Sequence, residues 1–267
     1  MTAQKRSTAC LLIIGNEVLS GRTKDANLAF LGERLNELGV RMAEARVLPD
    51  DEAVIVETLN AVRAKFDYVF TTGGIGPTHD DITAACIAKA FGRKLIRHPD
   101  AVALFEKKYQ AGELNEARLK MTEVPEGAVL VDNPVSQAPG FRIENVYVFA
   151  GIPRVMQAMF EGIKHELTGG ARVLSRTIAS HAKEGDLAAG LGALQNDYPD
   201  VEIGSYPFFS REGLTGVRVV VRSPDQTEID AVAERVRALV RAAGGEPVDE
   251  AVLGAGAEDL SGNKVSA

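Results

Sequence analysis

Apolar and polar positions alternate with two different periods along the first two thirds of the chain. Short apolar runs at residues 10–15, 46–48 and 68–70 are typical of buried strands. Between them, apolar residues at helical spacing predict a helix over residues 27–39 and a second over 52–64. Strands that alternate with amphipathic helices predict the α/β class, with a doubly wound, mostly parallel sheet covered on both faces.

The same periods continue beyond the third strand. Residues 99–121 are predicted to be helical with a break near Gly112, and apolar strands are predicted over residues 128–131 and 145–150. A proline well placed for a first helical turn then begins a helix over residues 153–167. The sheet and its helices therefore extend to about residue 167.

The sequence Thr168-Gly169-Gly170 is the clearest domain boundary of the chain. We predict an α/β domain over residues 1–168 and a small second domain, of order β-α-β-β-α, over residues 171–245. Residues 246–267 are rich in Gly, Ala, Glu and Asp and are predicted to be disordered.

Residues 71–83, with the sequence TTGGIGPTHDDIT, carry more chemical information than any other segment. They connect a predicted strand to a predicted helix, and glycines there let the backbone approach a ligand, while a helix N-terminus favours negative charge. Asp80 and Asp81 would repel a bare phosphate, so a divalent cation between them and a phosphate is expected. Thr78 and Asp81 fit a helix-capping box equally well, in which case Asp81 is structural.

Acidic residues follow three predicted strand ends. Glu17 follows the first strand, Asp50 the second, and Asp80 and Asp81 the third. Ligands of open parallel sheets bind beyond the carboxyl ends of the strands, so these acids converge on one cleft if the strands are neighbours. Oxygen ligands suit Mg²⁺ or Mn²⁺ better than Zn²⁺. The alternative is that Glu17 is a solvated loop residue and Asp50 a turn residue after a proline.

Charge and composition restrict the partners of this protein. The net charge of −7 argues against a nucleic-acid backbone as the main partner, and no apolar stretch is long enough to span a membrane. The N-terminus lacks the apolar core of a signal peptide. Cys10 and Cys86 are isolated and are predicted to be reduced core residues. We expect a cytoplasmic protein.

The glycine segment and three further segments resemble the molybdopterin-binding domain family of MoaB/Mog type. These segments are IGNEVLSGRTKDAN at residues 14–27, NPVSQAPGF at 133–141 and VFAGIP at 148–153, in the family's order. They look most like the branch that contains the CinA N-terminal region and the FAD synthase N-terminal domain, in which a similar small domain follows. Ala26 and Ala150 depart from that pattern, where threonine and proline are more usual.

The resemblance implies a set of site residues. Glu17, Asp50 and Asp81 are expected to be catalytic and to bind a divalent metal, Mg, Mn or Co. Ligand contacts are implied for Gly15, Ser20, Gly21, Thr23, Asp25 and Asn27 in the first segment, for Gly73, Gly74, Gly76, Thr78 and Asp80 in the glycine segment, for Asn133, Pro134, Pro139 and Gly140 in the third, and for Gly151 and Pro153 in the fourth. Asp25 is alternatively a helix cap, and residues 133–140 are alternatively a rigid connection.

Three functions are compatible with these features. The resemblance implies a metal-dependent nucleotide pyrophosphatase that binds a small phosphate-bearing molecule such as FAD or ADP-ribose and hydrolyses its diphosphate bond. The alternative is molybdopterin binding, or adenylyl transfer in molybdenum cofactor biosynthesis, without pyrophosphatase activity. A non-catalytic module that binds RNA through its small domain is disfavoured by the acidic charge and by the lack of a G-x-x-G clamp. The resemblance also implies a homo-oligomer.

Overall fold

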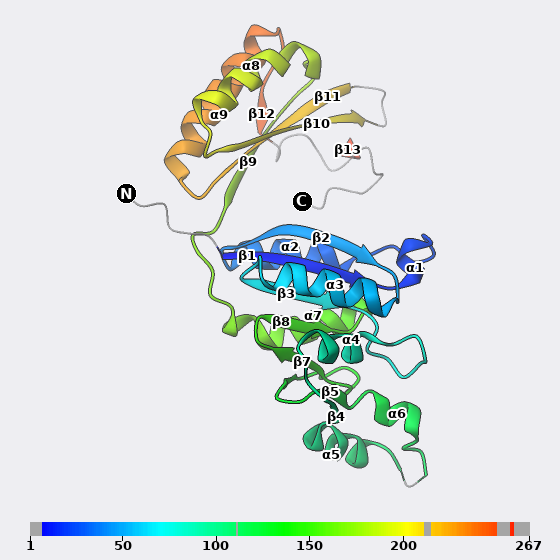
Figure 1. Ribbon diagram of the computed structural model, residues 1–267. Helices are drawn as coiled ribbons and strands as arrows, with labels where there is room; N and C mark the ends of the chain where they lie inside the picture. Colours follow the sequence, from blue (N-terminus) through cyan, green and yellow to red (C-terminus); the bar gives the residue numbers. More distant parts are fainter. Residues whose placement is uncertain (1–6, 111, 211–214, 250–256, 259–267) are drawn as a thin grey trace. The chain divides into compact units, whose positions relative to one another are not determined.

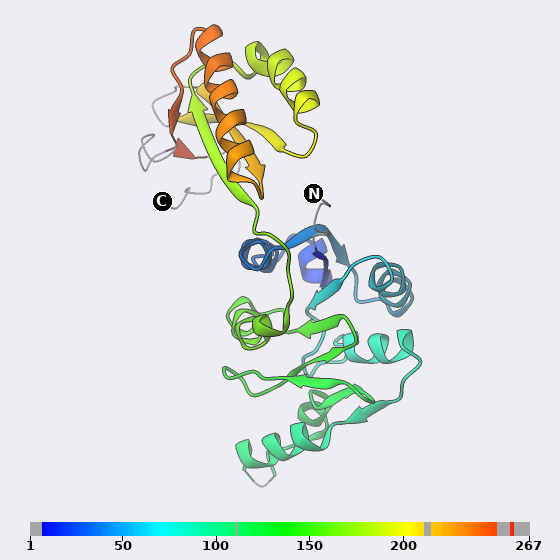
Figure 2. The same ribbon diagram turned by 90° about the vertical axis from the view of Figure 1, so that its left-hand side faces the viewer.

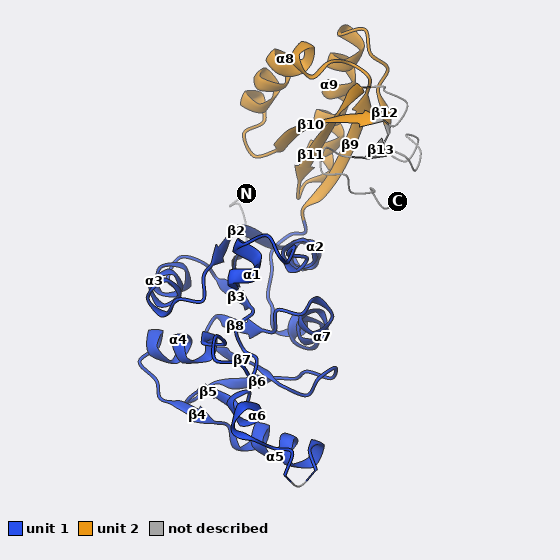
Figure 3. Ribbon diagram, turned by 90° about the vertical axis from the view of Figure 1, so that its right-hand side faces the viewer, with its two compact units in different colours: residues 1–172 blue, residues 173–267 orange. Residues whose placement is uncertain are grey.

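The computed structural model describes residues 7–110, 112–210, 215–249 and 257–258 (Figure 1). The chain divides into two compact units, residues 1–172 and 173–267, hereafter unit 1 and unit 2 (Figure 3). Among the described residues, no helix has the length and apolar character needed to cross a membrane.

The predicted linker at residues 168–170 belongs to unit 1. The Thr168 N–H donates to the Tyr68 hydroxyl at 2.8 Å, and the Gly170 N–H donates to the Gly39 carbonyl at 2.9 Å. A Cβ at Gly169 would lie only 1.8 Å from the Leu38 carbonyl oxygen, so the close approach requires glycine. The boundary therefore falls four residues beyond the predicted end of the first domain, between residues 172 and 173.

Unit 1 is built on a six-stranded sheet of order β2-β1-β3-β8-β7-β6. Its strands are β1 (Ser7–Ile14), β2 (Val40–Leu48), β3 (Tyr68–Thr72), β6 (Val129–Val131), β7 (Gly140–Ile143) and β8 (Val146–Phe149). β2, β1, β3, β8 and β6 run in the same direction, and β7 alone runs opposite, pairing antiparallel with β8 and with β6. The predicted mostly parallel sheet is confirmed.

Helices cover both faces of this sheet, as its alternating apolar residues require. One face packs against α3 (Glu52–Arg63) and α4 (Thr83–Ala90). The other packs against α2 (Asn27–Glu37) and α7 (Pro153–Ile163), which a short 3₁₀ turn extends. Figure 3 shows the two helix pairs on opposite sides of the sheet, and Figure 2 shows the same layers from the opposite direction.

An inserted subdomain lies between α4 and β6. It contains β4 (Leu95–Arg97), α5 (Pro99–Lys108), α6 (Glu116–Lys120) and β5 (Glu123–Pro125), and β4 pairs antiparallel with β5. The prediction of a helical segment over residues 99–121 with a break near Gly112 is confirmed in outline, as α5 and α6. The break begins at Tyr109, which adopts an extended conformation and ends α5. A new helix begins only where the Asn115 side chain accepts the Arg118 N–H at 3.0 Å.

Unit 2 consists of an antiparallel sheet of order β12-β9-β11-β10-β13 with two helices packed against one face. The strands are β9 (Leu174–Ser180), β10 (Glu202–Ser210), β11 (Thr215–Ser223), β12 (Val248–Asp249) and β13 (Ala257–Glu258), and the helices are α8 (Glu184–Asp197) and α9 (Gln226–Ala242). β12 pairs with β9, so disorder is wrong for these two residues of the predicted tail. Residues 250–256 and 259–267 of that tail lie outside the described part of the chain.

Candidate functional site

The carboxyl ends of four neighbouring strands meet at one edge of the unit 1 sheet. The Gly15 N–H, just beyond β1, donates to the Leu48 carbonyl of β2 at 3.1 Å, and the Gly73 N–H, just beyond β3, donates to the Phe149 carbonyl of β8 at 3.2 Å. The segments that follow these strands therefore begin side by side: the short helix α1 (Asn16–Leu19), which carries Glu17, and the loops that carry Asp50, the glycine segment and Gly151. We call this region the carboxyl edge.

The glycine segment folds back onto the start of α4. Gly73 and Gly74 have positive φ values of 99° and 67°. The buried Thr83 hydroxyl donates to the Gly73 carbonyl, and the Thr83 N–H donates to the Gly74 carbonyl, both at 3.0 Å. Cβ atoms at Gly73 and Gly74 would lie 2.1 Å from the Ile14 carbonyl oxygen and the Thr83 Oγ1, respectively. Protein contacts alone therefore require both glycines.

Asp81 closes a turn in front of the helix. Its Oδ2 accepts the Thr78 N–H at 2.8 Å and also the Thr78 hydroxyl, which reproduces the side-chain contact of a capping box. However, α4 begins at Thr83, and Ile82 is its N-cap without a side-chain hydrogen bond. The predicted capping box is therefore wrong in its placement. The pair instead stabilises the turn over residues 78–81, and Gly76 lies directly against the Asp81 carboxylate.

The other two predicted acids also contact the local backbone. Asp50 Oδ2 accepts the Asn16 N–H at 2.9 Å, and the Glu17 carboxylate lies against the Cα of Gly15. The described residues contain no group of three or more His, Cys, Asp or Glu side chains arranged to hold a metal ion. The three acids thus lie on neighbouring segments of the chain. Their carboxylates are not arranged around one shared metal ion.

The first loop is held mainly by its own backbone. The Ser20 hydroxyl donates to the Glu17 carbonyl at 3.2 Å, and the Thr23 N–H donates to the same oxygen at 3.0 Å. Gly21 has a φ of 72° and open space around its Cα. Asp25 Oδ1 accepts the Leu28 N–H at 2.9 Å, as the helix-cap alternative predicts.

Two buried oxygens at the carboxyl edge have no hydrogen-bond partner within the described part of the chain. Asn27 is 3% exposed, and its Nδ2 donates to the Gly151 carbonyl at 2.9 Å, but its Oδ1 accepts nothing from the described residues. Thr72, the last residue of β3, is 1% exposed, and its Oγ1 is likewise unpaired. Thr72 pairs in register with Ile13 and Phe149, which face α2 and α7. Both oxygens therefore belong to the same side of the sheet.

Residues 133–140, hereafter the proline loop, have the contacts of a rigid connection, which was the alternative to a ligand-binding role. Asn133 is 2% exposed, and its Nδ2 donates to the Ser136 hydroxyl and to the Ala138 carbonyl. Its Oδ1 accepts the N–H groups of Val135 and Ser136, each at 3.1 Å. The Asn133 side chain is thus fully used inside the loop. A Cβ at Gly140 would lie 2.3 Å from the Val148 carbonyl oxygen, so this glycine serves the pairing of β7 with β8.

The three prolines of the predicted site lie in different surroundings. Pro134 is exposed, and Pro153 occupies the first turn of α7 and is also exposed. By contrast, Pro139 is buried and lines a cavity beside the glycine segment. Pro139 is thus the one of these three that the structure places against a cavity.

The cavity beside the glycine segment lies on the α4 side of the sheet and encloses about 380 Å³ of empty space, its open mouth included. Gly74, Gly76 and Asp81 form one wall. The inserted subdomain supplies the opposite wall with Leu95, Lys120, Met121 and Glu123. Sequence reasoning missed this wall, because residues 95–123 are far from the glycine segment along the chain and carry no motif.

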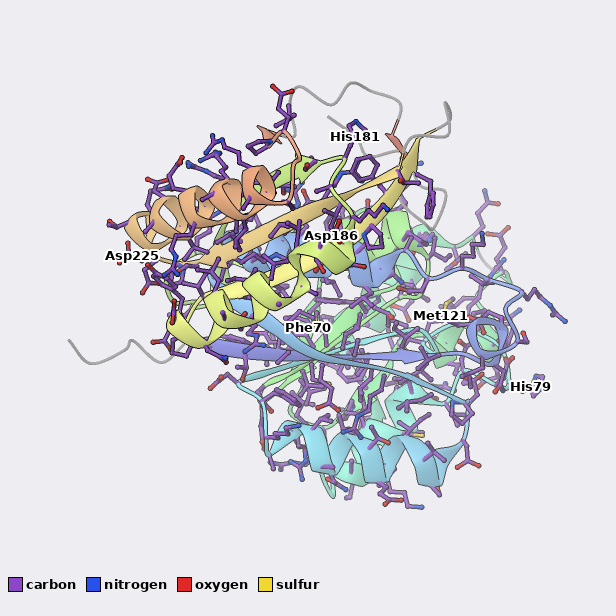
Figure 4. All side chains as sticks on the ribbon, turned by 90° about the horizontal axis from the view of Figure 1, so that it is seen from above. Phe70, His79, Met121, His181, Asp186 and Asp225 are labelled. Carbon is purple, nitrogen blue, oxygen red and sulfur yellow. The ribbon has the colours of Figure 1, made fainter. Side chains whose placement is uncertain are left out.

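His79 and Asp80 lie at the outer end of the glycine segment. Both are exposed, and Figure 4 shows His79 projecting at the periphery of the domain, away from Phe70 in the sheet. The Thr78 hydroxyl, followed by the Asp80 backbone N–H, lowers the pKa of the Asp80 carboxyl, and the positive charge of Lys120 acts in the same direction. Asp80 therefore remains ionised at neutral pH, next to the cavity that Lys120 lines.

The fold and this edge place the chain in a known class. Residues 10–169 match the family described as probable molybdopterin binding domain, and residues 172–247 match the middle domain of FAD synthase. The chain belongs to the molybdopterin-binding domain family. The domain match ends within four residues of the boundary between the two units.

Relatives and a solved structure support this assignment. A protein of Archaeoglobus fulgidus is 36% identical over 197 residues, which cover 74% of this chain and 84% of the relative. One of Aeropyrum pernix is 35% identical over 247 residues, covering 88% and 92%. The crystal structure of CinA from Thermoplasma acidophilum, described as a protein of unknown function, is 34% identical with a TM-score of 0.57, and covers 60% of this chain and 97% of that chain.

Proposed function

We propose that this protein binds a phosphate-bearing adenine dinucleotide or pterin at the carboxyl edge, and that it hydrolyses the diphosphate bond of dinucleotides such as FAD or ADP-ribose. The observation that carries the binding site is the pair of unpaired buried oxygens, Asn27 Oδ1 and Thr72 Oγ1. Burying a polar atom without a hydrogen-bond partner destabilises the fold. Such atoms at the carboxyl edge of a sheet are therefore typical of groups that bind a ligand. Backbone groups of the glycine segment lie directly beyond Thr72.

The hydrolysis is proposed from the family and from its chemistry. Water attacks one phosphorus of the diphosphate, the bridging P–O bond breaks, and two monophosphates leave. The matches to the molybdopterin-binding family and to the FAD synthase middle domain favour a ligand with a phosphate and a flat ring. Glu17, Asp50 and Asp81 are the candidate acids, with Mg²⁺, Mn²⁺ or Co²⁺ as the candidate cofactor. Because the three carboxylates do not form a metal site as placed, we assign no catalytic step to a metal.

The test uses two neighbouring threonines of β3. Thr72→Val removes a hydroxyl that bonds no described protein atom, so the fold should be unchanged or slightly more stable. Affinity for FAD or ADP-ribose should fall about tenfold, the equivalent of one hydrogen bond of about 1.4 kcal/mol. Thr71→Val is the matched control, because the Thr71 hydroxyl is also buried and unpaired among the described residues but lies one residue further from the carboxyl end of β3.

Affinity is measured by isothermal titration, and turnover by chromatography of the monophosphate products with Mg²⁺, Mn²⁺ or Co²⁺ and with a chelator. Equal affinities of the two variants and the wild type would remove Thr72 from the site. Tight binding of molybdopterin without hydrolysis of any dinucleotide would support the alternative, a binding or adenylyl-transfer role in molybdenum cofactor biosynthesis. Turnover that persists in the chelator would exclude the metal requirement.

A further inference from the structure

Lys120 is a positive charge at the cavity that forms no ion pair with a carboxylate of the described residues. Its ammonium donates to the Thr78 carbonyl of the glycine segment, and it lines the cavity together with Gly74, Gly76 and Asp81. Among the described residues, no carboxylate oxygen lies within 4 Å of the Lys120 Nζ, whereas Lys65, Lys89 and Lys164 of unit 1 each form such an ion pair. One hydrogen bond leaves two of its three N–H groups unused.

The acids around the cavity are already engaged elsewhere. Asp81 Oδ2 accepts two hydrogen bonds from Thr78, and Glu123 lies 3.6 Å from the Arg97 guanidinium. Asp80 interacts favourably with Lys120 through space, but the two do not form an ion pair. The Lys120 charge therefore remains available to an anion that enters the cavity.

The backbone that carries Lys120 is fixed on both sides. The Asn115 side chain caps the start of α6. At the other end, the hydroxyl of the buried Thr122, which follows α6, donates to the Leu119 carbonyl of the last helical turn. The Thr122 carbonyl in turn accepts the His98 N–H at 2.9 Å, which holds this segment against β4. A long side chain on a fixed backbone loses less entropy on binding, which favours a defined role for its head group.

We propose that Lys120 binds the phosphate of the ligand and supplies positive charge opposite the glycine segment. This inference rests on the proposed function, because it assumes a phosphate-bearing ligand. It assigns the inserted subdomain a role, since α6 brings a cation to the glycine segment. It also explains how a cavity bordered by Asp81 can accept an anion although the acids do not form a metal site as placed.

The experiment compares ligands that share adenosine and differ in phosphate. Affinities for adenosine, AMP and ADP-ribose are measured with Lys120→Met and Lys120→Arg, in Mg²⁺ and again in a chelator. Lys120→Met should weaken AMP and ADP-ribose about 10- to 100-fold and leave adenosine unchanged, because a charged hydrogen bond to phosphate is lost. Lys120→Arg should retain most of the affinity. The wild-type affinity for ADP-ribose should also fall more steeply with salt than that of Lys120→Met.

Lys108→Met is the matched control. Lys108 also belongs to the inserted subdomain and also donates to a backbone carbonyl, that of Ser136, but it does not line the cavity. This variant should bind all three ligands as the wild type does. An equal loss for adenosine and ADP-ribose in Lys120→Met would show that Lys120 only holds the loop, and no loss would remove it from the site. Wild-type protein that binds none of AMP, ADP-ribose and FAD would instead overturn the proposed function, and this inference with it.

Discussion

The contact between Gly74 and Thr83 provides a quantitative test of how the glycine segment is held. Gly74→Ala places a methyl group 2.1 Å from the Thr83 Oγ1, so the hydroxyl must move away from the Gly73 carbonyl. Losing that buried hydrogen bond costs about 1–3 kcal/mol. The positive φ of 67° adds about 1–2 kcal/mol for any residue with a Cβ. We therefore expect a total loss of about 2–5 kcal/mol.

Gly92 provides a control with nearly the same backbone. Its φ is 61°, and a Cβ there would meet nothing within 4 Å. Gly92→Ala should cost only the backbone contribution, about 1–2 kcal/mol. The difference between the two variants isolates the contact with Thr83. In the double variant Gly74→Ala/Thr83→Ala the displaced hydroxyl is absent, so the two substitutions should cost less together than separately, by about 1 kcal/mol or more.

The measurement must report on unit 1 alone, because the two units need not unfold together and a single transition is not assured. Hydrogen–deuterium exchange of the β1 peptide, whose residues lie in the core of unit 1, gives its opening free energy. Equal losses for Gly74→Ala and Gly92→Ala, or additive losses in the double variant, would refute the proposed packing of the glycine segment.

Three further predictions follow from individual contacts. Asp81→Asn keeps one carbonyl acceptor for the turn, so unit 1 should lose at most about 1 kcal/mol of stability in thermal melts. Dinucleotide hydrolysis should fall by orders of magnitude, because a candidate acid is lost. Full activity would leave Asp81 purely structural. Burial raises the pKa values of Cys10 and Cys86 to about 11, above the ordinary thiol value of about 9, so neither thiol should react with a thiol reagent at pH 8 until urea is added. Because the native state then holds protons that the unfolded state releases, stability should fall between about pH 9 and 11 in urea titrations at stepped pH; a flat profile would contradict the shift. Tyr68→Phe removes the hydroxyl that binds the backbone of Thr168, and should speed tryptic cleavage between the units; an unchanged rate would show that the remaining contacts suffice.

Local periodicity predicted the first half of unit 1 well. β1, α2, α3 and β3 have their predicted types because each buries an apolar face against one sheet. β2 was predicted too short: it runs from Val40 to Leu48 as the edge strand, and the charged residues Arg41, Glu44 and Arg46 interrupt its apolar run. Charged residues are typical of edge strands, so this error has a physical origin.

The errors beyond α4 come from contacts between residues distant in sequence. β7 was read as the end of a loop, because its strand character depends on a tight turn at Glu144, with a φ of 50°, that folds it back onto β8. The spacing of Thr78 and Asp81 correctly predicted that they bond. It misplaced the helix, because Thr83 bonds the carbonyls of Gly73 and Gly74 and so sets the first turn.

The candidate site shows which residues of a sequence motif carry information about a ligand. Gly73, Gly74 and Gly140 are each required by protein atoms that a Cβ would strike, so their presence does not by itself indicate a ligand. The informative groups are those that the described part of the chain leaves unsatisfied: the Thr72 hydroxyl, and the Lys120 ammonium, which donates to the Thr78 carbonyl and forms no ion pair there. A sequence shows residue types but not which hydrogen bonds are left unmade. The candidate acids could therefore be proposed from the sequence, because each follows a predicted strand. Lys120 could not, because it contacts Thr78, 42 residues away in the sequence, only in the folded chain.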